Sequence, residues 1–479
     1  MELKPKAVFD YFAEINKVPR PSKHEEKMIA YLKGFAEKNG LSFKTDETGN
    51  VLIAKPATPG MEGRPTVVLQ GHMDMVCEKR SDRVIDFEND PIETFIDGEW
   101  MRAKGTTLGA DDGIGVALAM AILTDESIKH GPIECLFTRD EETGLTGAFA
   151  IEPGFMTGKY LINLDSEDEG EIFIGCAGGV NTDIEFEYYA ETMPEGYVAM
   201  KVIVDKLTGG HSGDDINKNR ANANKILARF LYDIGGKYDV KLCSIDGGNL
   251  HNAIPRHAEA VIAVPEEQKH EVRSDFNIFA AAIQDEYHTT EPTAEFVMES
   301  VETPETSIDD ITANNLITAL NAVHNGVYEW SQDIPHFVET SSNLASVKMP
   351  EEGKIKIVAS QRSSTKSQLD AVCNAVASAF NLAGADVLIN EGYPGWKPNP
   401  DSELLKITVA KYKELFGKEP KVRAIHAGLE CGLFSEKYPG LDMVSFGPTL
   451  RGVHSPDEKL LIPTVEMVWR HLVAIIESL

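Results

Sequence analysis

Cysteines are scarce in this sequence, and their spacing does not pair them. The 479 residues include six cysteines, and no two of them form a Cys-x-x-Cys pair. This argues against both a disulfide framework and a thiolate zinc site. We therefore expect a reducing compartment, the cytoplasm.

The sequence also has few positively charged residues and no long apolar runs. Lys and Arg number 46 against 76 Asp and Glu, which gives a formal net charge of −30. Because such a chain repels polyanions and carries no Lys/Arg stripe, we expect neither a nucleic-acid partner nor an anionic membrane surface. No run reaches membrane-spanning length, and the first residues lack the apolar region of a signal peptide.

The composition is otherwise that of a globular protein. Hydrophobic residues make up 42% and charged residues 25%, without repeats or low-complexity tracts. The chain is longer than the roughly 250–300 residues at which a single core stops growing. We therefore expect two domains and enough core to form an active-site cleft.

The first third of the chain alternates apolar runs with a helical stretch. Runs at 66–70, 133–137 and 160–164 predict strands, and the small, apolar segment 113–123 predicts a helix. This order predicts an α/β sheet covered on both faces. Polar residues follow these strands, at the position where open α/β sheets bind their ligands.

The pattern changes from about residue 180. Alternating segments at 198–204 and 258–264 predict strands, with a helix between them at about 221–232. A similar pair follows, with a strand at 354–358 and a helix at about 367–382. This part of the sequence predicts a second domain of the α+β class.

The last part of the chain returns to the first pattern. A Pro/Gly cluster at 393–400 predicts a linker, and a helix is expected at 465–479. We therefore expect a catalytic domain formed by residues 1–182 and 397–479, with an inserted domain at 183–396.

Five short motifs concentrate the residue types that bind metals. They are Gln70–Val76, Thr106–Gly115, Thr138–Gly144, Leu164–Glu167 and Gly452–Glu458. Each alone has an ordinary explanation, such as a helix N-cap or a solvated acidic loop. Together they place two imidazoles and several carboxylates at the ends of apolar strands, a set that suits zinc, cobalt or manganese.

Spacing within the motifs indicates which residues bind a metal and which orient a neighbouring group or move protons. If the strand geometry continues, His72 and Asp74 project to the same side, so His72 can bind a metal while Asp74 orients a neighbouring group. The adjacent Glu141 and Glu142 can point in different directions, so that one ligates while the other moves protons.

With these motifs the chain resembles the bacterial aminoacyl-histidine dipeptidases, also called Xaa-His dipeptidases, peptidase D or carnosinase-like enzymes. They belong to the zinc aminoacylase and carboxypeptidase superfamily. The resemblance covers essentially the whole length and includes Phe173–Gly179, Gly209–Ile216, Asn252–Arg256 and His426–Gly432. It implies an α/β catalytic domain whose mixed sheet is flanked by helices, and an inserted α+β domain for lid closure and homodimerisation. It also implies hydrolysis of small peptides, preferentially Xaa-His dipeptides including β-Ala-His.

The resemblance further implies a set of metal ligands. Asp111 would bridge two divalent ions, with His72 and Asp165 on one ion and Glu142 and His454 on the other. Zinc is the expected metal, and cobalt and manganese are the alternatives.

Catalytic and substrate-binding roles follow from the same resemblance. Glu141 would be the general base and acid, and Asp74 would hold the imidazole of the histidine ligand in the first motif. His211 would stabilise the oxyanion, Arg362 would bind the substrate's terminal carboxylate, and Asn252 is a further candidate for the substrate pocket.

Other functions fit the same residues. A broad-specificity dipeptidase, a tripeptide aminopeptidase or an amino-acid deacylase would use the same machinery with a different pocket. A non-catalytic metal-binding scaffold is the alternative of another class, but it should have lost Glu141 or a ligand, and neither is missing.

Overall fold

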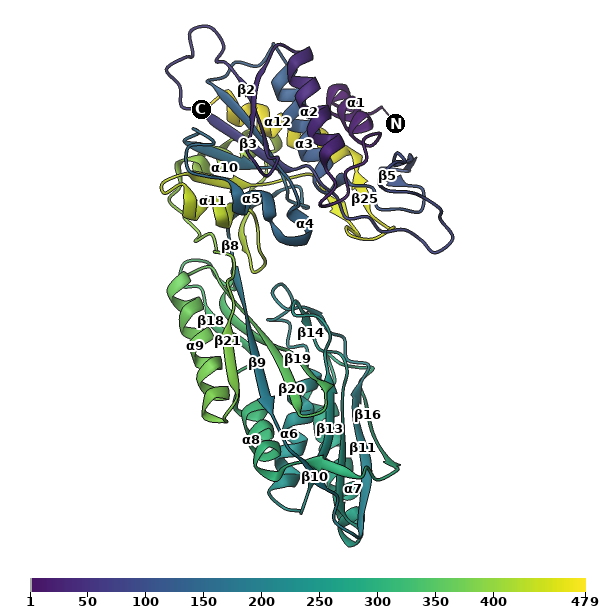
Figure 1. Cartoon of the computed structure of the whole chain (residues 1–479). Coiled ribbons are helices and arrows are strands. Elements are labelled where there is room, and N and C mark those ends of the chain that lie inside the picture. The colour runs from purple at the N-terminus through teal and green to yellow at the C-terminus, as the bar shows by residue number, and fades with distance from the viewer. Residues whose placement is uncertain (1) are drawn as a thin grey trace. The chain divides into compact units, whose positions relative to one another are not determined.

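The computed structural model describes residues 2–479, which fold into two compact units (Figure 1). The first unit consists of Met1–Cys176, Trp396–Ala424 and Leu429–Leu479. The second unit consists of Ala177–Gly395 and Ile425–Gly428. That the second unit serves as a lid and a dimerisation domain stays a prediction.

An eight-stranded mixed sheet forms the centre of the first unit, in the order β1-β2-β6-β3-β7-β23-β8-β22. The strands are β1 (Ser42–Thr45), β2 (Val51–Lys55), β3 (Val67–His72), β6 (Ile133–Thr138), β7 (Tyr160–Asn163), β8 (Glu171–Cys176), β22 (Lys421–Ile425) and β23 (Asp442–Ser445). β3 pairs in parallel with both β6 and β7. Every residue of β3, β6, β7 and β8 is buried, so both faces of the sheet are covered. The predicted α/β class is confirmed.

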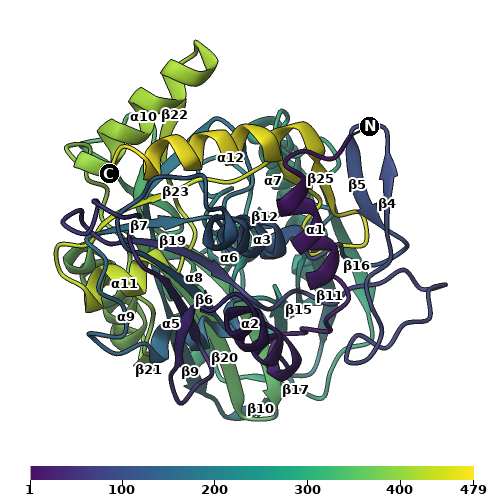
Figure 2. The ribbon, with the colours of Figure 1, turned by 90° about the horizontal axis from the view of Figure 1, so that it is seen from above.

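Helices pack against this sheet and against one another. They are α1 (Lys6–Ile15), α2 (Glu26–Lys38), α3 (Ala110–Thr124), α4 (Glu141–Gly144), α5 (Thr146–Ala150), α10 (Glu403–Phe416), α11 (Cys431–Lys437) and α12 (Ile462–Ile476). α3 lies on β3 and β6 and is almost completely buried, because its residues are small and apolar. α1 packs on α3, and α10 packs on α12 (Figure 2).

A second, four-stranded sheet in this unit runs β24-β25-β5-β4. Its strands are β4 (Thr94–Asp97), β5 (Trp100–Ala103), β24 (Leu450–Arg451) and β25 (Lys459–Leu461). α12 follows it directly and begins earlier than predicted, because Pro463 stands in its first turn, where a missing N–H costs nothing.

The second unit is built on a nine-stranded sheet whose main path is β16-β11-β15-β13-β19-β20-β9-β21, with β18 on β19. The strands are β9 (Gly178–Glu187), β11 (Tyr197–Asp205), β13 (Lys241–Gly247), β15 (Ala258–Pro265), β16 (Glu295–Val301), β18 (Gly326–Trp330), β19 (Val338–Glu351), β20 (Lys354–Ser363) and β21 (Asp386–Ile389). Their pairings are antiparallel. The alternating burial along β11 follows the alternation that predicted it.

The helices of the second unit share one hydrophobic core with this sheet. They are α6 (Ala223–Gly235), α7 (Lys269–Glu286), α8 (Asp310–Ala322) and α9 (Lys366–Leu382), with a short 3-10 helix at Glu266–Gln268. Two small strand pairs complete the unit: β10 (Ala190–Thr192) with β17 (Thr306–Ile308), and β12 (Gly210–His211) with β14 (Ala253–Ile254). The predicted α+β character of this region is confirmed.

Two expectations from composition can be compared with the structure. All six cysteines are free. Among residues 2–479, none of the helices has the length and apolar character that a membrane crossing requires.

Candidate metal centre

The carboxyl ends of three parallel strands bring the predicted ligands together in the first unit. His72 is the last residue of β3, the pair Glu141 and Glu142 follows β6 at the start of α4, and Asp165 comes shortly after β7. The strands are in register, with His72 opposite Thr138 in β6, so their ends lie level. This is the edge at which open α/β sheets bind ligands.

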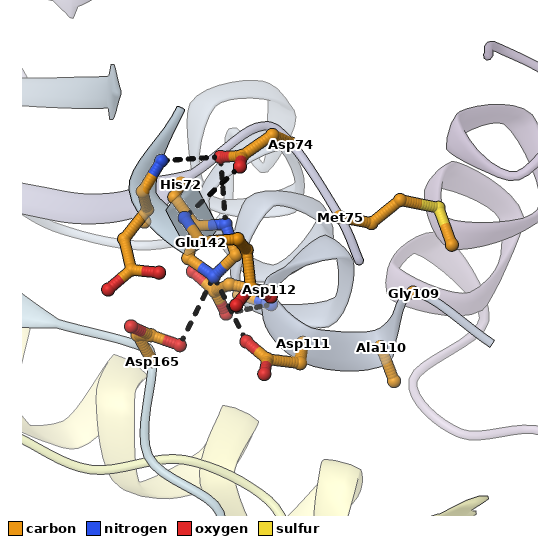
Figure 3. A network of polar contacts seen from close by, with 12 residues as sticks. His72, Asp74, Met75, Gly109, Ala110, Asp111, Asp112, Glu142 and Asp165 are labelled. Atoms are coloured by element: carbon orange, nitrogen blue, oxygen red, sulfur yellow. Dashed lines mark hydrogen bonds and ion pairs between the residues drawn. The ribbon is translucent and has the colours of Figure 1, made fainter. Parts of the chain in front are cut away.

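One group of possible ligands surrounds His72, whose side chain is buried. Its Nε2 lies 3.0 Å from Oδ1 of Asp111 and 3.6 Å from Oδ1 of Asp165 (Figure 3). These three residues each offer a ligand atom within 4.8 Å of the others. They are the three residues predicted to hold one ion.

A second group surrounds His454. Its Nε2 lies 3.0 Å from Oδ2 of Asp111 and 3.0 Å from Oε2 of Glu142. These three atoms also lie within 4.8 Å of one another. The two groups share Asp111, which turns a different carboxylate oxygen to each histidine. Since the side chain of His454 is 53% exposed, the second group opens toward solvent.

Asp112, the neighbouring aspartate, makes different contacts. Oδ1 of Asp112 accepts the N–H of Gly115 at 3.2 Å, in the manner of a helix cap. A Cβ on Gly71 would stand 2.1 Å from Oδ2 of Asp112, so a larger residue there would displace the Asp112 side chain. The ordinary capping explanation therefore applies to Asp112 and leaves Asp111 free to face the histidines.

The electrostatics of the cluster fit a bound cation. Burial opposes charge on His72, but Asp165 and Asp111 raise its pKa well above the usual value. Contacts with Asp111 and Glu142 raise the pKa of His454 to about 11. Oε1 of Glu142 is buried and has no hydrogen-bond partner among residues 2–479. An uncompensated carboxylate oxygen beside two imidazoles suits a divalent ion of the zinc type.

Asp74 connects the histidine of the first group to the glutamate pair. It is fully buried, and its Oδ1 lies 3.2 Å from Nδ1 of His72. The same oxygen accepts the N–H of Glu141 at 3.1 Å, and Oδ2 accepts the N–H of Glu142 at 3.3 Å. Ser22 donates its hydroxyl to Oδ2 at 2.8 Å. One carboxylate thus orients a ring and two backbone groups.

Glu141 lies beside the two ligand groups without belonging to either of them. With His72 and Glu142, Glu141 forms a third group of possible ligands, whose ligand atoms lie within 4.8 Å of one another. Burial raises the pKa of Glu141 well above its usual value. Its position and chemistry suit a group that exchanges protons near the ligands.

The structure gathers three other predicted residues within the second unit. β12, which ends at His211, pairs with β14, which follows Asn252. The N–H of Ser212 donates to the carbonyl of Asn252 at 2.9 Å, and the hydroxyl of Ser212 accepts Nε of Arg362 at 3.4 Å. Ser212, which follows His211 directly, therefore links it to Asn252 and Arg362. The side chain of Asn252 is exposed.

The imidazole of His211 has a defined hydrogen-bonding state. Its Nδ1 accepts the N–H groups of Gly213 at 3.2 Å and Asp214 at 3.1 Å. Burial and the charge of Arg362 lower its pKa, which favours the neutral ring. Because Nδ1 accepts, the proton of the neutral ring sits on Nε2, which is left as a donor.

Arg362 is a buried cation whose partners are neutral. It is 6% exposed, and its Nη1 donates to the hydroxyl of Tyr393 at 2.8 Å. The hydrogen-bond partners of its guanidinium are the hydroxyl groups of Ser212 and Tyr393. A buried guanidinium with hydroxyl partners retains capacity for an anion.

Glu25, a buried glutamate that no sequence motif marks, supports the turn that carries Glu141. Oε1 of Glu25 accepts the N–H of Lys23 at 2.7 Å and that of Asp140 at 3.0 Å. Its Oε2 lies 2.6 Å from Nη2 of Arg139. In the sequence Glu25 is only an acid before an amphipathic helix, which is an ordinary place for one. Its contacts with residues 139 and 140 could not be inferred without the fold.

Two groups of possible imidazole and carboxylate ligands lie at the carboxyl edge of a mixed sheet, an arrangement that fits a metal-dependent hydrolase. The chain belongs to peptidase family M20/M25/M40, which matches residues 68–478, and is a hydrolase of peptide bonds. The family consists of metallopeptidases, which implies divalent metal ions, and the two groups around His72 and His454 are candidates to bind them.

Two similar proteins match nearly the whole chain. One is the cytosol non-specific dipeptidase of Escherichia coli (strain K12), 42% identical over 478 residues, which are 100% of this chain and 98% of that protein. The other is the crystal structure of aminoacylhistidine dipeptidase from Vibrio alginolyticus, with a TM-score of 0.93 and 44% identity. That match covers 100% of this chain and 97% of the other.

A more distant structure shares the fold alone. The aminopeptidase PepT from Bacillus cereus has a TM-score of 0.58 at 19% identity and covers 99% of both chains.

Proposed function

We propose that this enzyme is a dipeptidase that works with two divalent ions, zinc first among them, and prefers Xaa-His dipeptides such as β-Ala-His. The observation that carries the two-ion proposal is the sharing of Asp111 between two ligand groups. The names of the Escherichia coli and Vibrio alginolyticus relatives support a dipeptide substrate. The preference for histidine rests on the name of the Vibrio protein and on the sequence resemblance.

The donor sets assign ligands to each ion. His72, Asp111 and Asp165 would hold one ion, and Asp111, Glu142 and His454 would hold the other. When bound, the pair of ions lowers the pKa of a water molecule from ~15.7 toward neutrality and polarises the peptide carbonyl.

Glu141 is the proposed proton carrier. Its carboxylate takes the proton from the attacking water and gives it to the leaving amine. The role needs a carboxylate that is close to the ions without ligating them, and the proximity of Glu141 to His72 and Glu142 supports this assignment. The raised pKa of this carboxyl favours its acceptance of the proton.

Asp74 is the proposed partner of His72. It accepts the Nδ1–H of His72, which fixes the ring and leaves Nε2 unprotonated for ligation. The same carboxylate holds the N–H groups of Glu141 and Glu142, so it also fixes the turn that presents the proton carrier.

Residues of the second unit are proposed to bind the substrate. Nε2–H of His211 would donate to the oxyanion that forms at the scissile carbonyl. Arg362 would bind the terminal carboxylate of the peptide, for which its buried and uncompensated charge is suited. Asn252 is proposed to line the same pocket.

We also propose that the protein forms a homodimer through the second unit. Its proposed location is the cytosol. The sequence resemblance supports the dimer, and exposed aromatic side chains on β18, Tyr328 and Trp330, give the unit an apolar surface to cover. The six free cysteines and the name of the Escherichia coli relative support the location. Light scattering on purified protein tests the dimer.

A broad-specificity dipeptidase is the second candidate, favoured by the word non-specific in the name of that relative. Hydrolysis of β-Ala-His, Gly-His, Leu-Leu and a tripeptide, before and after chelation and zinc addition, distinguishes the candidates. Chelator-sensitive cleavage of the Xaa-His dipeptides alone supports the first. Cleavage of every dipeptide supports the second, and cleavage of the tripeptide points to an aminopeptidase. No cleavage by metal-loaded protein contradicts both and favours a deacylase or a scaffold.

A further inference from the structure

One buried carboxylate organises the backbone that carries Asp111. Oε2 of Glu458 accepts the N–H groups of Leu108 at 2.6 Å and Gly109 at 3.0 Å. Its Oε1 accepts those of Ala110 at 2.8 Å and Asp111 at 3.3 Å. Four consecutive amides therefore converge on one side chain, which is 2% exposed.

These amides have no helical partner of their own. Leu108 and Gly109 precede α3, and Ala110 and Asp111 lie before its regular helical part. Gly109, the N-cap residue, has no side chain with which to cap them, and Asp111 and Asp112 have non-helical backbone angles. Glu458 supplies the acceptor that these four amides need, because a buried backbone N–H without a partner is costly.

The opposite side of the same segment is held by a buried arginine. Nη2 of Arg20 donates to the carbonyl of Gly109 at 2.6 Å, while Nη1 donates to the carbonyl of Asp74 at 2.8 Å. Arg20 is 1% exposed. The segment before α3 therefore lies between a buried anion on its N–H side and a buried cation on its carbonyl side.

Glu458 also belongs to the segment that carries the second histidine. It stands four positions after His454, and its N–H donates to the carbonyl of Ser455 at 3.0 Å. The next residue begins β25, which pairs with β5. The side chain of Glu458 thus connects the His454 loop directly to the Asp111 segment. Because both its oxygens are taken up by amides, it is not one of the ligands.

We propose that Glu458 is the positioning residue of the metal centre: it sets the direction of the Asp111 carboxylate and fixes the spacing between the two histidines. The proposal rests on the proposed two-ion function. Glutamine at this position would keep one acceptor oxygen and turn an NH₂ group toward backbone N–H groups. Two of the four amides would lose their acceptor, and Asp111 would lose its fixed orientation.

The test compares Glu458→Gln with Asp457→Asn, a matched control in which the adjacent, exposed carboxylate pairs only with Arg80. Metal-free protein is titrated with Co²⁺, and binding and the visible absorption spectrum of the cobalt form are recorded. Glu458→Gln is expected to bind Co²⁺ at least about tenfold more weakly, with an altered spectrum and a lower kcat at unchanged KM, while Asp457→Asn matches the wild type. Glu458→Asp, which keeps the charge, should restore part of the affinity.

Amide exchange on the unmodified chain tests the proposal even if the variants do not fold. The four amides at 108–111 should exchange slowly in metal-free as well as metal-loaded protein, because Glu458 holds them without the ions. Fast exchange in the metal-free protein, or a folded Glu458→Gln with wild-type Co²⁺ affinity and spectrum, overturns the role of Glu458. Failure of the wild type to bind Co²⁺ overturns the two-ion proposal instead. Slow exchange of the four amides would in that case still show that Glu458 holds them.

Discussion

His454 and Asp111 are 343 positions apart in the sequence, yet Nε2 of the histidine lies 3.0 Å from Oδ2 of the aspartate. This contact joins the two ends of the first unit across the whole inserted segment. On its other oxygen Asp111 meets His72, also at 3.0 Å. The proposed two-ion site would therefore depend on this aspartate.

Replacing Glu141 by glutamine should separate metal binding from catalysis. We expect kcat to fall roughly 10²- to 10⁴-fold, because the proton carrier is lost. The metal content should stay at the wild-type level, because Glu141 is in neither of the two proposed ligand sets. Steady-state kinetics and elemental analysis of the same sample measure both, with the exposed Glu47→Gln as control. Substantial residual activity would remove Glu141 from the mechanism.

Asp74→Asn should lower the affinity of the protein for its metal. The amide is a poorer acceptor for Nδ1–H of His72, and loss of such a partner typically lowers metal affinity 10- to 100-fold, roughly. Competition with a chelator measures the change. Ser22→Ala, which removes one donor to Asp74 and leaves the carboxylate, should change the affinity much less. Equal affinities for Asp74→Asn and the wild type would refute the role of Asp74.

Two glycines offer a matched pair of alanine substitutions. At Gly71 the new Cβ would collide with Oδ2 of Asp112, so Gly71→Ala should lower the free energy of unfolding by about 1–3 kcal/mol. At Gly34, in the exposed part of α2, a Cβ meets nothing within 4 Å, so Gly34→Ala should raise it by about 1 kcal/mol. Urea unfolding of metal-free protein measures both. A neutral Gly71→Ala would contradict the packing described for Asp112.

Arg362→Met should affect dipeptides through their terminal carboxylate. Hydrogen bonds to a charged group contribute about 1.5–3 kcal/mol, so KM for a dipeptide should rise roughly 10- to 100-fold. A dipeptide amide, which lacks the carboxylate, is the control substrate and should be cleaved equally by variant and wild type. If the variant loses activity on both substrates alike, Arg362 is not the carboxylate-binding residue.

Much of the fold was predictable because its strands are continuous apolar runs. The segments at 66–70, 133–137 and 160–164 form β3, β6 and β7, and the ligands follow where parallel strands end. The pattern could not show which of Asp111 and Asp112 faces the site, since both are equally suited to a helix start. That difference depends on backbone angles, which the sequence does not display.

The supporting residues were beyond sequence reasoning for a related reason. Glu25 and Glu458 act on amides that are distant in the sequence, and a side chain that binds a backbone leaves no trace in the composition of that backbone. The same holds for Arg20, whose acceptors are carbonyl groups. Residues that ligate metals have characteristic side chains, whereas residues that position the ligands can be recognised only from the contacts they make.

The most direct test of the two-ion account is the metal content of wild type and Asp111→Asn, measured by elemental analysis after zinc loading and removal of free metal. The account predicts two ions per chain in the wild type and loss of tightly bound metal from both positions in the variant, because each ligand group contains Asp111. A wild type with a single ion that Asp111→Asn leaves in place would contradict it.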